Sequence, residues 1–261
     1  GNAIAKQNWD IVGLSEDFNY HTELTAPLAN LYHVGTHRGG VSGLSNDTDG
    51  LGLLVAKRDG TGFSGESWTG WSTYNGYTDS GADGLIEKGF RYYAVTIASG
   101  IVIDVYVLHM DADSNAGDIE ARETQLAQLA AYIKGTSNKR PILIIGDTNC
   151  RYTREHLQTG FIDVINADSR FTIKDAWVEK VWNGVYPTYG ADAMMWYNAP
   201  YNNNTGEVVD KIFYINNTES SLTIEANSYL HNTSFGVSDH YPVIVNFTIT
   251  DPTATALTAA E

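Results

Sequence analysis

The feature that most constrains this chain is a series of apolar segments of strand length. Each is rich in β-branched, leucine or aromatic residues and is bounded by glycine, asparagine, aspartate or serine, the pattern of buried strands. The segments span 10–16, 51–58, 91–98, 101–109, 141–147, 211–216, 222–230 and 241–249. A chain with so many strand-like segments is predicted to fold around β-sheets.

One segment, 118–135, has the clear pattern of a helix. Its apolar face consists of Ile119, Leu126, Leu129, Ala130 and Ile133. These positions recur at the three- and four-residue spacing of a helix face, and Gly135 is expected to end the helix. The helix joins the strand ending at His109 to the strand ending at Asp147. Strand, helix and strand in this order favour an α/β fold with two sheet faces to cover.

The domain organisation follows from the absence of internal repeats and linkers. We predict a single domain over residues 1–250 and a frayed tail over the low-complexity residues 251–261. Two segments, 65–84 and 184–207, mix glycine, asparagine and aromatic residues. This composition is typical of long functional loops, so we expect no regular element in either.

The charge balance limits how the protein finds a ligand. The chain has 31 acidic and 16 basic residues, a net charge of −15. Broad attraction to a phosphate backbone is therefore excluded, although a divalent cation can supply positive charge locally. No apolar stretch approaches the roughly 20 residues needed to cross a bilayer. Abundant glycine, asparagine, tyrosine and threonine with few lysines favour a secreted, periplasmic or cell-surface protein.

Polar side chains occupy the ends of several predicted strands. They are Glu16, His109, Asp147, Asn149, Asp210, Asp239 and His240. Carboxylate and amide oxygens are the ligands preferred by Mg²⁺, Mn²⁺ and Ca²⁺. Histidines paired with carboxylates carry protons near neutral pH. The combination indicates metal-assisted hydrolysis of a phosphoester.

Each of these residues also has a structural explanation. The structural alternatives are a loop cap for Glu16, an Asx-turn for Asp147 and Asn149, a structural role for His109 and an ion pair for Asp210. The segment "SDHYPV", 238–243, is the most specific signal, because Ser, Asp and His in a row before a strand have little structural purpose. Several separate structural explanations would be needed for these polar residues, whereas one shared functional site explains all of them.

The segment 142–150, "ILIIGDTNC", raises the sharpest question about geometry. If the chain stays extended through Thr148, Asp147 and Asn149 lie on one face and Cys150 on the other. We therefore expect Cys150 to be a structural thiol. As the chain's single cysteine, it also excludes an intramolecular disulfide and a cysteine-based zinc site.

Seven motifs in order resemble the endonuclease/exonuclease/phosphatase superfamily, nearest its neutral sphingomyelinase-like branch. The motifs are "GLSEDF", "DGLGLLVAKR", "VLHMDA", "RETQLAQL", "IIGDTNCR", "VVDKIFY" and "VSDHYPV". The resemblance implies a DNase I-like α/β fold, a four-layer sandwich of two mostly antiparallel sheets flanked by helices. It also implies a first strand, apparently missing from this chain, that ends in a metal-binding asparagine; Asn2 lies too close to Glu16 to be that residue.

The resemblance further implies an enzyme, a Mg²⁺-dependent phosphoric diester hydrolase, with Mn²⁺ or Ca²⁺ as alternative ions. The implied roles are metal binding by Glu16 and Asp239, phosphate contact or leaving-group protonation by His109, orientation of the nucleophile by Asp147, phosphate binding by Asn149, proximity to the substrate for Arg151 and Asp210, orientation of His240 by Asp239, and general base catalysis by His240. Each role rests on a matched motif position.

The substrate remains open between a phospholipid headgroup and a nucleic acid. Trp68, Trp71 and Trp196, together with Met195, are candidates for contact with a lipid surface, while packing on the sheet edge is their structural alternative. The alternatives to a sphingomyelinase-like enzyme are a secreted endonuclease, an inositol-phosphate phosphatase, or a non-catalytic binding protein that keeps the fold. No feature indicates an obligate protein partner.

Overall fold

The centre of the protein is a six-stranded sheet in the order β4-β5-β6-β7-β9-β8. Its strands are β4 (Gly62–Gly70), β5 (Gly89–Ala98), β6 (Ile101–His109), β7 (Ile142–Asp147), β8 (Phe171–Asp175) and β9 (Asp210–Asn217). Neighbours run antiparallel except for the parallel pair β6 and β7. The computed structural model describes every residue except 39–47, 76–85, 137, 198–206 and 253–261.

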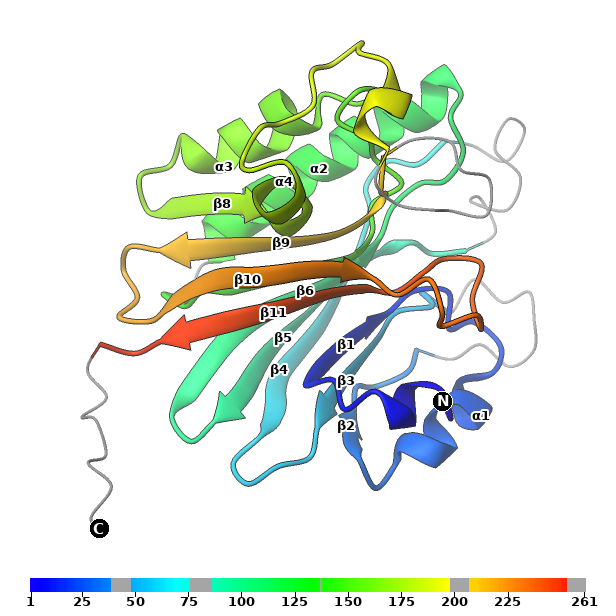
Figure 1. The fold of residues 1–261 in the computed structure, drawn as a ribbon, viewed down its shortest axis with the longest axis vertical. Helices are drawn as coiled ribbons and strands as arrows, with labels where there is room; N and C mark the ends of the chain where they lie inside the picture. Colours follow the sequence, from blue (N-terminus) through cyan, green and yellow to red (C-terminus); the bar gives the residue numbers. More distant parts are fainter. Residues whose placement is uncertain (39–47, 76–85, 137, 198–206, 253–261) are drawn as a thin grey trace.

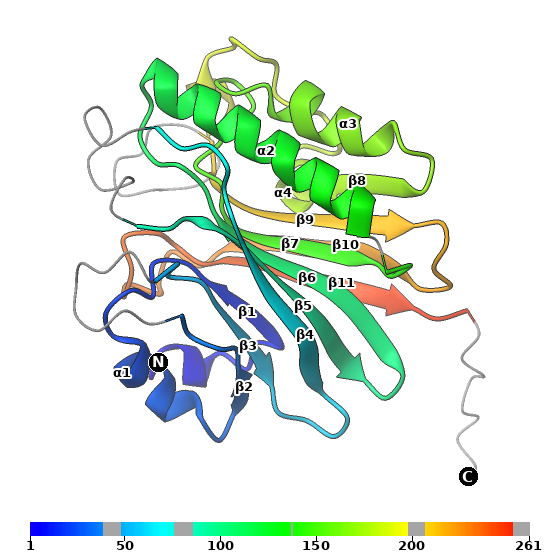
Figure 2. The ribbon, with the colours of Figure 1, turned by 180° about the vertical axis from the view of Figure 1, so that it is seen from behind.

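Helices cover one face of this sheet. The long helix α2 (Ala116–Thr136) forms the crossover between the parallel strands β6 and β7 and lies beside α3 (Asp163–Asn166), as Figure 2 shows; α4 (Ala176–Val181) packs against β8, β9 and β10. A large apolar core between the helices and the sheet includes Phe90, Tyr106, Leu129, Trp177 and Phe213. None of the helices that the structure describes is long and apolar enough to cross a membrane.

Two smaller sheets cover the opposite face (Figure 1). One has the order β1-β3-β2, from β1 (Ile11–Leu14), β2 (Tyr32–Val34) and β3 (Gly52–Ala56); the other pairs β10 (Thr223–His231) with β11 (Val243–Thr250). A second core beneath them includes Leu53, Val55, Val107, Ile145 and Tyr214. The short elements η1 (Ile4–Lys6), α1 (His21–Thr25) and η2 (Ala26–Leu28) pack near the outer side of the three-stranded sheet, around Leu28 and Leu54.

The structure confirms the α/β fold class and all eight predicted strand segments. The predicted helix is α2, which continues one residue past Gly135. The expectation of an irregular segment over 65–84 is wrong for residues 65–70, which belong to β4. As an edge strand β4 is largely half-buried or exposed, so it lacks the apolar run of a buried strand. In the segment 184–207 the described part contains one short helix, η5 (Ala193–Trp196).

The resemblance implied two mostly antiparallel sheets. Among the described residues the structure has three, a six-stranded, a three-stranded and a two-stranded sheet. Most of the predicted frayed tail, 253–261, lies outside the described residues.

Candidate functional site

The register of the central sheet places three polar residues in one row. His109 on β6 lies opposite Asp147 on β7, and Asp147 lies opposite Asp210 on β9. Residues directly opposite one another on neighbouring strands point to the same face of a sheet, so these side chains converge. Gly146 has a φ of 148°, and a Cβ there would lie 2.0 Å from the Leu108 carbonyl oxygen. Only glycine lets β6 and β7 approach at this point.

His240 completes the cluster from the opposite layer. It lies in the turn before β11, and its ring nitrogen Nδ1 is 2.8 Å from Oδ2 of Asp210. Ligand atoms of Asp147, Asp210 and His240 all lie within 4.8 Å of one another. We call these three residues the strand-end cluster. Asp210 is thus a hydrogen-bond partner of His240, while Asp239 lies in the exposed turn next to the ring; orientation of His240 by Asp239 stays a prediction.

The strand-end cluster shifts the protonation of its members. The hydrogen bond that His240 donates to Asp210, together with the charges of Asp210 and Asp147, raises the pKa of His240 to about 9 despite partial burial. Burial and the neighbouring Asp210 charge raise the pKa of Asp147 to about 7. Burial, reinforced by the charges of Lys88 and His240, holds the pKa of His109 well below its usual value. At neutral pH His109 is therefore neutral and His240 is protonated.

Glu16 and Asp147 approach the buried ring of His109 from two sides. The Nε2 atom of His109 is 3.8 Å from Oε1 of Glu16 and 3.9 Å from Oδ2 of Asp147. Among the described residues the Nδ1 atom of His109 has no hydrogen-bond partner. The side chain of Glu16 is 60% exposed, and its backbone adopts a left-handed φ of 61° that is uncommon outside glycine. The buried ring thus lies next to both carboxylates, and Glu16 is the more exposed of the two.

The loop after β7 differs from the extended geometry that we expected. Asn149 has a φ of 50°, and its backbone N–H donates a 2.8 Å hydrogen bond to Oδ1 of Asp147. The side-chain amide of Asn149 donates to the Met110 carbonyl at 3.3 Å. The segment is thus an Asx-turn, because an asparagine tolerates the left-handed conformation that closes such a turn. Cys150 is confirmed as a buried free thiol, and burial raises its pKa.

Three basic residues lie near this loop. The backbone N–H of Arg151 donates to Oε2 of Glu155 at 2.7 Å, which places Arg151 behind the Asx-turn. The guanidinium of Arg154 contacts both Glu155 and the Asn149 carbonyl. Lys88 is buried, donates to the Met110 carbonyl at 3.0 Å, and lowers the pKa of His109. The sequence interpretation missed Lys88 and Arg154, since no periodic or spacing signal marks either position.

The tryptophans expected at a lipid surface have different surroundings. Trp71 is only 6% exposed, and its indole N–H donates a 2.7 Å hydrogen bond to the His109 carbonyl, so its prediction as a loop contact is wrong. Trp196 packs edge to face on Trp182 with ring centres 4.8 Å apart, which agrees with the structural alternative. The ring of Trp68 on β4 is covered by the guanidinium of Arg38 at 4.0 Å.

A cavity of about 900 Å³ leads away from the strand-end cluster, between β1, β11 and the central sheet. Its polar end is lined by Glu16, Asp147, Asp210, Asp239 and His240. Much of the remaining lining is apolar and includes Ile11, Ile145, Val245, Phe247 and Ile249. The cluster is therefore open to a ligand, as a site built on rigid strand ends must be.

The donor set at the polar end fits a hard divalent cation. Glu16, Asp147 and Asp210 offer carboxylate oxygens, the ligands that Mg²⁺ prefers. Burial, and then repulsion by the Asp210 charge, raises the pKa of Asp147, and a cation bound there would favour the ionised carboxylate. The asparagine that the resemblance implies at the end of an earlier strand has no counterpart among the matched motifs.

The mixed central sheet faced by further strands defines an α/β fold that solved structures share. The structure of D. rerio TDP2 complexed with single-strand DNA product has a TM-score of 0.64 at 17% identity, covering 95% of this chain and 89% of that chain. A beta toxin variant from Staphylococcus aureus, solved with bound magnesium ions, has a TM-score of 0.60 at 16% identity, covering 93% and 89%. At these identities the likeness shows the fold alone.

The sequence model of Endonuclease/Exonuclease/phosphatase family 2 matches residues 19–246. The chain belongs to this family, which confirms the resemblance seen in its motifs. A sphingomyelinase of Mycobacterium bovis is 29% identical over 170 residues, which cover 62% of this chain and 31% of that protein. The match thus spans about a third of the relative's length.

Proposed function

We propose that this protein is a Mg²⁺-dependent phosphodiester hydrolase whose centre is the strand-end cluster. The observation that carries the proposal is the hydrogen-bonded pair of Asp210 and His240, held within 4.8 Å of Asp147 at the ends of strands in register. Family membership and the similarity to sphingomyelinases support it. The packing of two small sheets against a helix-covered central sheet also supports the four-layer sandwich.

Three carboxylates are available to hold the ion. Glu16, Asp147 and Asp210 line the polar end of the cavity, and Asp239 offers a further oxygen from the adjoining turn. When bound, Mg²⁺ stabilises negative charge on the phosphate in the transition state. The magnesium in the similar beta toxin structure supports this choice of ion, and Mn²⁺ and Ca²⁺ remain alternatives with the same oxygen preference.

We assign His240 as the general base. Asp210 accepts the hydrogen bond from Nδ1 and leaves Nε2 to take a proton from the attacking water. The water oxygen forms a bond to phosphorus as the bond to the leaving oxygen breaks. A base must be neutral, whereas the pKa of His240 near 9 keeps the ring charged at neutral pH. Added positive charge beside Asp147 and Asp210 would lower that pKa into the working range.

The remaining residues position the phosphate. The neutral ring of buried His109 faces Glu16 and Asp147, so we assign it a hydrogen bond to a phosphate oxygen or the leaving oxygen. Asp147 then orients the water. Asn149 belongs to the Asx-turn on Asp147, so we assign it to holding that carboxylate in place as well as to phosphate binding.

For the substrate we favour a phospholipid diester. The sphingomyelinase relatives and the apolar continuation of the cavity support a lipid, while a net charge of −15 disfavours broad contact with nucleic acid. The composition also favours a secreted or cell-surface location, which we retain as part of the proposal.

A substrate panel tests this function. The full chain is incubated with sphingomyelin, a lysophospholipid, supercoiled DNA and inositol phosphates, with Mg²⁺ and with a chelator. We expect release of the phosphorylated headgroup from the lipid only when Mg²⁺ is present. Nicking of DNA alone would identify the endonuclease alternative, and release of inorganic phosphate from inositol phosphates would identify the phosphatase. Absence of metal-dependent turnover on every substrate would favour the non-catalytic binding protein.

A further inference from the structure

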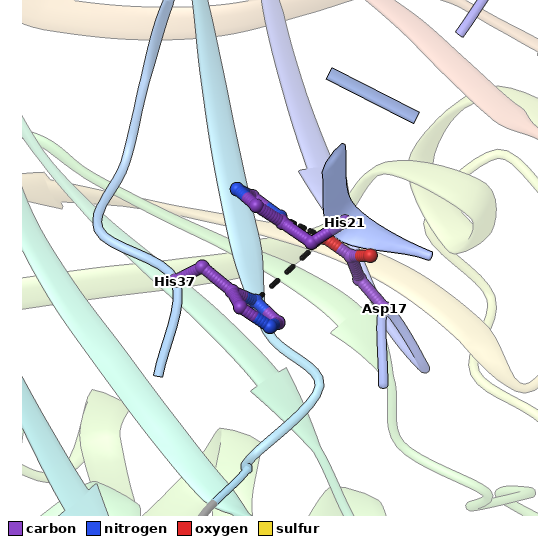
Figure 3. A group of neighbouring side chains, drawn as sticks. All are labelled: Asp17, His21 and His37. Atoms are coloured by element: carbon purple, nitrogen blue, oxygen red, sulfur yellow. Dashed lines mark hydrogen bonds and ion pairs between the residues drawn. The ribbon is translucent and has the colours of Figure 1, made fainter. Parts of the chain in front are cut away.

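A second group of metal-ligating side chains lies apart from the strand-end cluster in the sequence. It consists of Asp17 after β1, His21 at the start of α1, and His37 after β2, and we call it the histidine cluster (Figure 3). One ligand atom from each residue lies within 4.8 Å of the other two. Neither the proposed hydrolysis nor the family motifs account for two histidines at this position.

The contacts inside the histidine cluster are those of a carboxylate between two imidazoles. Oδ2 of Asp17 is 2.5 Å from Nδ1 of His21 and 4.0 Å from Nδ1 of His37. The two rings are stacked with centres 4.0 Å apart and an angle of 9° between their planes. Figure 3 shows both rings turned toward the Asp17 carboxylate. Because the two ring planes are nearly parallel, one ring must rotate about its side-chain bonds before both nitrogens can bind the same ion.

One donor atom of the cluster is buried and unused. Among the described residues Nδ1 of His37 has no hydrogen-bond partner, although it is shielded from solvent. The nearby Oδ2 atom of Asp17 is 4.0 Å from this nitrogen, too far for a hydrogen bond. A buried polar atom without a partner is unfavourable, and buried nitrogen atoms of histidine are common metal ligands.

The backbone that carries the cluster is held in place by buried contacts. Arg91 pairs with Asp49 and Glu66 at 2.7 Å each and donates to the carbonyl of Thr36, the residue before His37. The backbone N–H of Asp17 donates to the Gly50 carbonyl at 2.9 Å. Both loops are therefore fixed independently of any ligand, which is the preorganisation that a binding site needs.

The same packing continues one residue beyond Asp17. Phe18 lies against Gly50, where a Cβ would come within 2.2 Å of its ring. Gly50 also has a left-handed φ of 63°. A glycine is needed at this position on both counts, and it lets Phe18 anchor the segment that carries Asp17.

The donor set identifies the class of ligand. Two imidazole nitrogens and one carboxylate oxygen suit zinc and similar first-row transition metals, whereas Mg²⁺ prefers oxygen ligands alone. Donors around a tetrahedral ion lie about 3.3 Å apart, given metal–ligand bonds of roughly 2.0–2.1 Å. The 2.5 Å and 4.0 Å contacts of Asp17 bracket that separation. We propose that Asp17, His21 and His37 bind one zinc-class ion, at a site separate from the strand-end cluster.

An ion in the histidine cluster would cross-link three segments of the chain. It would tie the turn after β1 to the start of α1 and to the loop after β2. Asp17 directly follows Glu16, whose backbone has the left-handed φ of 61°. The ion would thus fix the residue that the proposed function uses for Mg²⁺; this consequence rests on the proposed function, whereas binding of the ion does not.

Binding is measured with the full chain in excess Mg²⁺, so that oxygen-rich sites are filled. Co²⁺ serves as a spectroscopic probe for zinc, because tetrahedral Co²⁺ absorbs strongly in the visible range. We expect one Co²⁺ per chain and about 10-fold or greater loss of affinity in His21→Gln and in His37→Gln. His156→Gln is the matched control, since His156 also pairs with a carboxylate and stacks on an aromatic ring. It should bind as the wild type does.

A second measurement covers the case in which a variant fails to fold. X-ray absorption of the zinc-loaded wild-type protein counts imidazole ligands, and the histidine cluster predicts two. No bound ion in excess Mg²⁺, or equal affinity in wild type, His21→Gln and His37→Gln, would overturn the proposal. Loss of binding in His240→Gln with retention in His21→Gln would overturn it as well, because the ion would then belong to the strand-end cluster.

Discussion

The strand-end cluster and the histidine cluster combine the same two side-chain types in opposite proportions. Asp147, Asp210 and His240 offer two carboxylates and one imidazole, whereas the histidine cluster offers one carboxylate and two imidazoles. Oxygen-rich sites suit Mg²⁺ and nitrogen-rich sites suit zinc. The proportion of oxygen to nitrogen donors is therefore the feature on which the two proposed sites differ.

The two clusters also differ in how the fold builds them. Strand register fixes Asp147 and Asp210, so the distance between their carboxylates follows from the sheet itself. Asp17 and His37 lie on loops whose positions depend on the buried pairing of Arg91 with Asp49 and Glu66. A sheet therefore sets the first geometry and side-chain packing sets the second.

The largest expected effect is the loss of activity when a residue of the strand-end cluster is replaced. His240→Gln should lower the rate of Mg²⁺-dependent phosphodiester hydrolysis by about 10²–10⁴-fold, since general base catalysis contributes that much. The check is kcat/KM on the best substrate of the panel, with far-UV circular dichroism to confirm folding. His156→Gln, which removes a histidine paired with Glu123 elsewhere on the surface, is the control and should keep the wild-type rate. Equal rates for His240→Gln and wild type would remove His240 from the mechanism.

The second effect tests which carboxylate acts on His240. Asp210→Asn should lower the pKa of His240 from about 9 toward its ordinary value, because the hydrogen bond to Asp210 is the main cause of the shift. Asp239→Asn removes a more distant charge and should lower it much less. NMR titration of the ring protons in metal-free buffer measures both variants. A larger shift in Asp239→Asn would restore the role that the sequence assigned to Asp239.

The third effect concerns the support beneath the strand-end cluster. Trp71→Phe removes the indole donor to the His109 carbonyl and should lower the free energy of unfolding by about 1–3 kcal/mol, the cost of a buried acceptor left unpaired. Trp196→Phe, which changes a half-buried ring in η5, is the comparison variant and should cost less. Urea unfolding measures both. An equal loss in the free energy of unfolding for both variants would show that the hydrogen bond from Trp71 to the His109 carbonyl does not stabilise the fold.

The smallest effect is a pH dependence of stability. The folded-state pKa of His240 near 9 exceeds the ordinary value of about 6.5, so the folded protein holds this proton more tightly than the unfolded chain. The resulting stabilisation is complete below about pH 6.5 and is lost as the pH rises to about 9. The folded-state pKa of Asp147, about 7, also exceeds the unfolded value of about 3.9. Protonation of Asp147 therefore stabilises the folded state below about pH 4, and this stabilisation is lost as the pH rises to about 7.

Urea unfolding in metal-free buffer between pH 6.5 and 9 checks this dependence. His240→Gln should lose less stability than the wild type over that interval, because it has no proton to release. An identical decline in both proteins would contradict the assignment of the titration to His240.

The sequence predicted those strands and helices that are marked by a pattern of neighbouring residues. Alternating and continuous apolar runs identified eight strands, and the three- and four-residue spacing identified α2. It missed β2, β4 and β8. All three are edge strands whose apolar residues are interrupted by polar or glycine residues. They therefore lack the continuous apolar run that marked most of the predicted strands.

The sequence predicted which strand ends carry the residues of the candidate site. It did not predict which of these residues form hydrogen bonds with one another. His109, Asp147 and Asp210 follow from strand boundaries. The pairing of Asp210 with His240 joins two different sheets across 30 positions, and no spacing rule contains it. The tertiary fold decides such pairs.

The histidine cluster was only half visible in the sequence. Asp17 and His21 have the four-residue spacing of neighbouring groups on a helix turn, which was a usable signal. His37 reaches them through the hairpin-like pairing of β2 with β3, and no local pattern predicts that approach.

One measurement tests the central claim that the strand-end cluster is a Mg²⁺ centre that uses His240 as its base. The pKa of His240 is determined by NMR titration of the full chain without metal and with saturating Mg²⁺. The account predicts a value of about 9 without metal and a clear fall when Mg²⁺ binds beside Asp147 and Asp210, since added positive charge disfavours the protonated ring. The same pKa with and without Mg²⁺ would contradict it.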